Sequence, residues 1–89
     1  MGKWNYTLRF GKNLRDAIDE GDVESAVKCL IACYRELLNR MNEDDRDYYE
    51  SDIEDTIFNL ENFDVSEDVD DYLEEFYDIC DDVRAWIGI

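Results

Sequence analysis

Two apolar stripes with helical spacing constrain the fold of this 89-residue chain more than any other feature. In each stripe the apolar residues follow one another at alternating steps of four and three, which places them on one side of an α-helix. Stripes of this kind are typical of helices that pack at a shallow angle in a bundle. The first consists of Val23, Val27, Leu30, Tyr34, Leu37 and Met41, and the second of Val69, Leu73, Phe76, Cys80, Val83 and Ile87.

A third helix is predicted between the stripes, where apolar residues again recur on one helical face. Asn42 is its predicted N-cap, and Ser66 is the predicted N-cap of the last helix. Acidic residues follow both caps and complement the positive end of each helix dipole. The apolar residues of this third helix are Tyr49, Ile53, Ile57, Leu60 and Phe63, with Phe58 beside them.

The N-terminal segment predicts an arm followed by a short helix. That helix would start near Asn13 and end at Gly21, with Asp22 as the N-cap of the next helix. Apolar residues alternate between positions 4 and 10 as they do in a strand, but no other segment alternates, so a strand would lack a partner. We therefore expect a helix or an extended arm that packs on the bundle.

Together these patterns predict one all-α domain over residues 1–89. Its expected architecture is a small antiparallel helical bundle of three long helices plus a short N-terminal helix or arm, because short connections make neighbouring helices antiparallel. The expected segments are residues 1–21 for the arm and short helix, 22–41 for the first long helix, and 43–63 and 66–87 for two acidic helices.

Cysteine content and hydropathy predict a soluble cytoplasmic protein. Three cysteines are an odd number, and no signal peptide precedes them, which argues against a disulfide scaffold. No apolar run approaches the ~20 residues that a membrane-spanning helix needs. If a phage encodes the chain, the expected compartment is the cytoplasm of its host.

The net negative charge comes from the second half of the chain. The net charge is −16; residues 1–42 hold seven basic and six acidic side chains, and residues 43–89 hold two basic and nineteen acidic ones. Ordinary solvated helices mix the two signs, because pairs of opposite charge at i, i+4 stabilise a helix by ~0.2–0.5 kcal/mol each. Like charges at this spacing, as at Asp70 and Glu74, cost similar amounts. The penalty indicates a functional surface.

The residue types present argue against enzymatic activity and against a bound cofactor. There is no histidine to serve as a general base near neutral pH and no glycine-rich phosphate loop. Residues 64–75 carry oxygen donors at several EF-hand positions, but Val69 replaces the required glycine. A capped acidic helix start is the favoured interpretation. Cys29 and Cys33 lack the further ligands that zinc needs and are interpreted as small buried hydrophobes.

The density of carboxylates predicts a surface that resembles nucleic acid. Nine carboxylates between Glu67 and Asp82 give about one charge per 2.7 Å of helix, against about one per 3.4 Å for a DNA strand. Tyr48 and Tyr77 lie among the carboxylates and are candidate interface anchors. The acidic candidates for partner binding are Asp44, Asp47, Glu50, Glu54, Asp55, Glu67, Asp70, Asp71, Glu74, Glu75, Asp78, Asp81 and Asp82.

The leading hypothesis is a binding protein that blocks a basic DNA- or RNA-binding protein, without binding nucleic acid or a membrane itself. In charge, size and helicity alone, the chain resembles small acidic inhibitors of phages and mobile elements, including DNA mimics and some anti-CRISPR proteins. A second hypothesis is a helical adaptor, antitoxin or homo-oligomeric assembly module, such as a homodimer, that docks through an apolar stripe. A third is a calcium-binding acidic protein.

Overall fold

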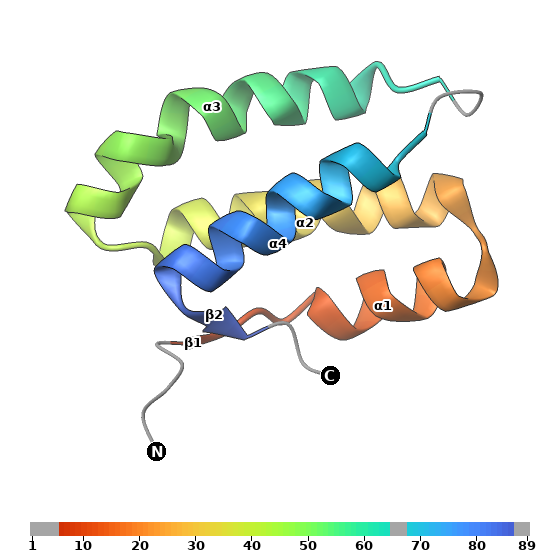
Figure 1. Cartoon of the computed structure of the whole chain (residues 1–89), viewed down its shortest axis with the longest axis horizontal. Coiled ribbons are helices and arrows are strands. Elements are labelled where there is room, and N and C mark those ends of the chain that lie inside the picture. The colour runs from red at the N-terminus through yellow and green to blue at the C-terminus, as the bar shows by residue number, and fades with distance from the viewer. Residues whose placement is uncertain (1–5, 65–67, 87–89) are drawn as a thin grey trace.

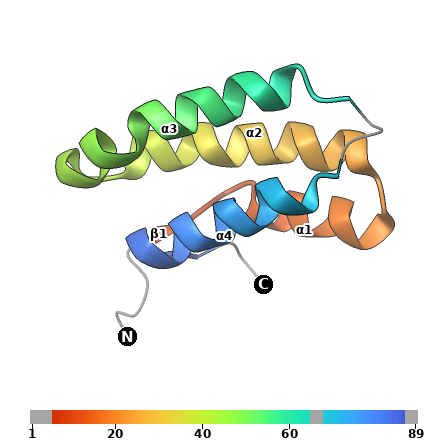
Figure 2. The same ribbon diagram turned by 45° about the horizontal axis from the view of Figure 1, so that its top comes forward.

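The computed structural model describes residues 6–64 and 68–86. Within them, four helices follow one another in alternating directions along the long axis of the molecule (Figure 1). The prediction of a small all-α bundle with three long helices and a short N-terminal one is confirmed. Figure 2 shows α2 and α3 running side by side, with α4 against α2 on another side. The helices are α1 (Gly11–Glu20), α2 (Val23–Arg40), α3 (Glu43–Glu61) and α4 (Asp70–Val83).

The ends of the first three helices follow the predicted capping residues. Gly21 ends α1 in the left-handed conformation, with φ of 73°, where a residue with a side chain would be strained. Asp22 caps α2, its side chain accepting a hydrogen bond from the Ser25 backbone N–H at 3.1 Å. Asn42 caps α3 in the same way through Asp45, at 2.9 Å. The helix α1 starts two residues before the predicted Asn13, at Gly11.

The predicted span of the last helix, 66–87, was too long at both ends. The helix α4 begins at Asp70, whose backbone N–H is bound by the Asp68 carboxylate at 2.9 Å. It ends at Val83, because Arg84 adopts the left-handed conformation and turns the chain away. Ser66, the predicted N-cap, and Ile87, the end of the apolar stripe, lie outside the described residues.

A two-stranded parallel pairing closes the fold, and the prediction that an N-terminal strand would lack a partner was wrong. The strand β1 (Tyr6–Thr7) pairs with β2 (Ala85–Trp86), which directly follows α4. Strands of two residues are too short to show the alternation on which that prediction relied. Of the two expected alternatives, a helix or an extended arm, the described part of this segment before α1 is extended at Tyr6–Thr7. Arg40 of α2 donates a hydrogen bond to the Thr7 carbonyl at 2.6 Å and so ties this arm to the bundle.

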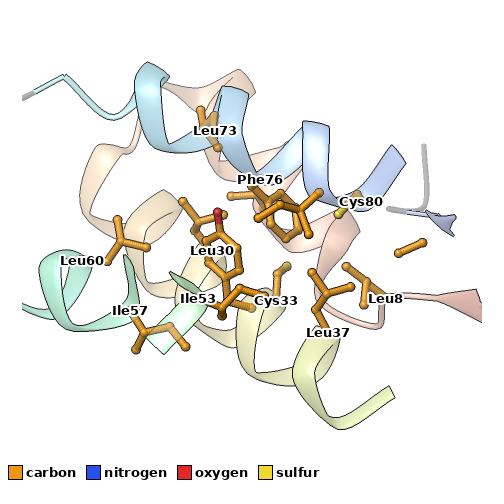
Figure 3. Close-up of a cluster of buried hydrophobic side chains, with 14 of the residues drawn as sticks. Leu8, Leu30, Cys33, Leu37, Ile53, Ile57, Leu60, Leu73, Phe76 and Cys80 are labelled. Atoms are coloured by element: carbon orange, nitrogen blue, oxygen red, sulfur yellow. The ribbon is translucent and has the colours of Figure 1, made fainter. Parts of the chain in front are cut away.

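The described residues of the two apolar stripes pack in one core, with Val23 and Val69 only partly buried (Figure 3). The central contact joins Tyr34 of α2 to Phe76 of α4, whose ring centroids lie 5.0 Å apart at an interplanar angle of 80°. Both side chains are fully buried, as is Ile53 of α3. Cys33 and Cys80 lie in the same core, where burial raises the pKa of each thiol to about 12. They pack as small hydrophobes.

We predict that Tyr34→Phe stabilises the protein. Within the described residues the Tyr34 hydroxyl is buried without a hydrogen-bond partner, and an unsatisfied buried polar group costs free energy. Removing it should raise the free energy of unfolding by about 1 kcal/mol, measured by thermal or urea unfolding. Tyr49→Phe is the control, because its hydroxyl donates to Asp82 and its loss should not stabilise. Equal or lower stability of Tyr34→Phe would show that the hydroxyl is satisfied in solution.

Candidate functional site

The carboxylates of α4 lie together on its outward side and form one continuous surface. All of them are exposed. At about 100° per residue they cover an arc of roughly 140°, centred opposite the buried Leu73, Phe76 and Cys80. They follow one another over about 18 Å of helix, or roughly one every 3 Å. This surface, called the α4 acidic face below, consists of Asp70, Asp71, Glu74, Glu75, Asp78, Asp81 and Asp82.

The charge of the α4 acidic face is not balanced by basic side chains on the same helix. The sequence from Asp70 to Val83 contains no Lys or Arg. Four ion pairs within the described residues use carboxylates of other helices, namely Glu24, Glu36, Glu50 and Glu61. Asp81 and Asp82 also lie in the last turn of α4, where the negative end of the helix dipole disfavours them. The face therefore keeps a strong negative potential.

The carboxylates of α3 surround the helix instead of forming a second row. Glu61 pairs with Arg35 of α2 at 2.8 Å. Glu54 and Asp47 lie on the same edge of α3 as Glu61, because they precede it by seven and fourteen residues. Glu50 lies near this edge and pairs with Arg46, 3.8 Å away. Asp44 and Asp55, eleven residues apart, lie on the outward side. The predicted α3 candidates are all exposed but point in different directions.

Two hydroxyl groups of α3 contact the edge of the α4 acidic face. The Tyr49 hydroxyl donates to the Asp82 carboxylate. The single proton of the Thr56 hydroxyl is shared between the Asp52 carbonyl of α3, at 2.9 Å, and Glu75 Oε1 of α4, at 3.1 Å. The partners are spaced by seven residues on both helices, as two antiparallel helices in register require. Asp82 is therefore held in position by a neutral donor, and Glu75 lies beside a second hydroxyl group.

Sequence reasoning missed the α3 carboxylates that lie nearest to this junction. Asp45 and Asp52 precede Tyr49 and Thr56 by four residues and so share their side of α3. Asp45 is close enough to Tyr49 to contribute to the raised pKa of that phenol. A helical-wheel comparison with Tyr49 would have placed both aspartates beside the core-facing side. The edge that faces α4, however, is known only from the packed helices.

The two candidate tyrosines occupy different environments. Tyr48 is 75% exposed, and its ring packs edge to face against Tyr49 with centroids 4.8 Å apart. Tyr77 is half-buried and flanks the core next to Phe76, so it is not an exposed anchor. Phe58, expected beside the buried face of α3, is instead 66% exposed. Glu67, the remaining candidate, lies outside the described residues.

No family model, curated protein or solved structure matches the chain.

The described residues do not form a metal site of acidic or cysteine side chains. Among them, no three or more such side chains converge to hold a metal ion. The second half of the EF-hand-like stretch, from Asp70 to Glu75, belongs to the helix α4 and is not a loop.

In the same described residues, none of the helices combines the length and apolar character required to cross a membrane.

We predict that the Tyr49–Asp82 hydrogen bond makes stability depend on alkaline pH. This bond, together with burial and nearby negative charge, raises the pKa of Tyr49 from 10.0 to about 12. A raised folded-state pKa gives stability that is complete below pH 10 and is lost as the pH rises through about 12. The difference in unfolding free energy between wild type and Tyr49→Phe should therefore be constant below pH 10 and shrink above it, as measured by urea unfolding.

Tyr48→Phe is the matched control for this prediction. It removes an exposed hydroxyl from the neighbouring ring and leaves the Tyr49–Asp82 bond in place. The unfolding free energy of Tyr48→Phe should fall above pH 10 as that of wild type does. A Tyr49→Phe curve parallel to wild type up to pH 12 would mean that the bond does not form in solution.

Proposed function

We propose that this chain is a non-enzymatic inhibitor that occupies the nucleic-acid-binding surface of a basic DNA- or RNA-binding protein. The observation that carries the proposal is the α4 acidic face, with its roughly 3 Å spacing of carboxylates along a rigid helix. One strand of duplex DNA carries about one charge per 3.4 Å. A groove lined by Lys and Arg for a phosphate backbone would therefore meet a similar charge density on α4.

The energetic cost of the α4 acidic face supports a role in binding. Four like-charged pairs stand at i, i+4 on α4, and each costs about 0.2–0.5 kcal/mol. They are Asp70/Glu74, Asp71/Glu75, Glu74/Asp78 and Asp78/Asp82. A small domain is stabilised by only about 5–15 kcal/mol in total, so a repulsion of one or two kcal/mol is substantial. Charge needed for solubility alone could be spread over the surface without it.

The burial of both apolar stripes favours this proposal over docking through a stripe. Leu30 and Leu37 of the first stripe and Leu73 and Phe76 of the second are buried within the chain's own core. A partner therefore meets charge on α4 and not an apolar row. The biological setting that we propose is inhibition of a host defence protein by a phage or mobile element in the host cytoplasm, as an anti-CRISPR protein or another DNA mimic would act.

The test of this proposal is capture of the partner followed by competition with nucleic acid. The full chain, immobilised at low ionic strength, should retain a basic nucleic-acid-binding protein from a host lysate, and duplex DNA or RNA should displace it. The purified partner should bind much more weakly as salt rises, because screened long-range attraction supplies much of the interaction. A captured protein whose affinity is the same at low and high salt, or that binds nucleic acid simultaneously, would refute the proposal.

We predict that neutralising the α4 acidic face weakens partner binding and stabilises the fold at the same time. The variant combines Glu74→Gln, Asp78→Asn and Asp81→Asn, which are exposed positions outside the first turn of α4. Three of the four like-charged pairs disappear, so the unfolding free energy should rise by about 1 kcal/mol at low salt. Circular dichroism during thermal unfolding measures the stability, and calorimetric titration measures the binding.

A charge-matched control separates the α4 acidic face from net charge. The α1 residues Asp16, Asp19 and Glu20 are exposed, and their amide variants change the net charge by the same amount. This control should bind the partner nearly as wild type does. If both triple variants lose binding equally, bulk charge explains the interaction and the α4 acidic face has no special role.

A further inference from the structure

The outward side of α3 carries a second regular stripe, which faces solvent. Its residues follow one another at steps of four, three, four and three, and they lie opposite the buried Ile53 and Leu60. Every residue of the stripe is exposed. This α3 outer stripe consists of Asp44, Tyr48, Ser51, Asp55 and Phe58.

Aromatic rings and carboxylates are neighbours along the α3 outer stripe. Asp44 precedes Tyr48 by four residues, and Asp55 precedes Phe58 by three, so each ring has a carboxylate one turn away. Tyr48 and Phe58 are 75% and 66% exposed, which leaves a face of each ring accessible. The two rings are ten residues apart, or about 15 Å along the helix axis.

Tyr48 is held in position although it is exposed. Its ring packs edge to face on Tyr49, at an interplanar angle of 88°, and the Tyr49 hydroxyl is bound to Asp82 of α4. The position of the Tyr48 ring is thus restricted by Tyr49, which is itself bound to a residue of the α4 acidic face. A partner that binds there loses little additional side-chain entropy at Tyr48, as is typical of interface anchors.

An accessible ring beside a carboxylate fits a guanidinium group better than an ammonium group. The planar guanidinium of arginine stacks on aromatic rings, is weakly hydrated and forms two parallel hydrogen bonds with a carboxylate. Lysine offers a compact, strongly hydrated charge without this geometry. Carboxylates alone would attract both residue types by charge.

We propose that the α3 outer stripe is an arginine-selective docking surface, on which arginine side chains of the basic partner stack on Tyr48 and Phe58 and pair with Asp44 and Asp55. The inference rests on the proposed function, since it names the residue type that the basic partner presents. It assigns long-range attraction to the α4 acidic face and selectivity for arginine to α3.

The test compares two fluorescent peptides of equal length and charge, one arginine-rich and one lysine-rich, binding to the full chain at fixed salt. Wild type should bind the arginine peptide about tenfold more tightly, because a guanidinium both stacks on the ring and pairs with the neighbouring carboxylate, which an ammonium group cannot do in the same geometry. Tyr48→Leu with Phe58→Leu keeps the apolar bulk but removes the rings, so the preference should fall toward one. The matched control, Tyr48→Phe with Phe58→Tyr, keeps both rings and should keep the preference.

The outcomes separate this inference from the proposed function. Equal binding of the two peptides to wild type, or an arginine preference that survives in the leucine variant, would overturn the docking surface on α3. The proposed function would still stand if the Glu74, Asp78 and Asp81 triple variant weakened both peptides and the partner alike. Circular dichroism confirms that each variant is folded, which is expected because both substituted side chains are exposed.

Discussion

The apolar contact between α4 and α2 supports the rest of the molecule. A 14-residue helix with seven carboxylates has little stability of its own, because short isolated helices are marginal in water and like charges destabilise them further. Burial of one large side chain such as Phe76 contributes about 1.5–3 kcal/mol, which exceeds the cost of several repulsive pairs. Since Phe76 packs on Tyr34 in the core, the opposite side of α4 can carry unbalanced charge and remain rigid.

Hydroxyl groups connect the two acidic helices without adding a positive charge between them. A basic side chain between α3 and α4 would have neutralised part of the surface. Tyr49 instead donates a neutral hydrogen bond to Asp82, and the Thr56 hydroxyl shares its proton between the Asp52 carbonyl and Glu75, so neither contact cancels the charge of a carboxylate. The proposed division of roles between the two helices follows from this arrangement. The α4 acidic face provides the electrostatic attraction, and α3 provides aromatic rings that recognise the shape of the partner's side chains.

Periodicity predicted the helices that pack through regular stripes, and capping residues predicted where three of them begin or end. The stripe on α4 fixed which side of that helix is acidic, so its candidate residues were found together. The α3 candidates rest on their charge alone, which does not say which side of the helix each carboxylate occupies. Phe58 is predicted beside the core because it is hydrophobic, but hydrophobicity alone does not make a side chain buried, and Phe58 is exposed. The ends of α4 depend on Asp68 and on the conformation of Arg84, which periodicity does not detect.

The pairing of Tyr6 with Ala85 has a consequence for the order in which the chain folds during synthesis. Almost the whole described chain lies between these two residues, so the contact is among the most non-local that the fold can make. On the ribosome, α1, α2 and α3 emerge before β2 has been translated, so β1 cannot yet form its strand pairing. The acidic helix and its closing strand emerge after α1, α2 and α3, so the charged surface is presented only once the helices that support it have been made.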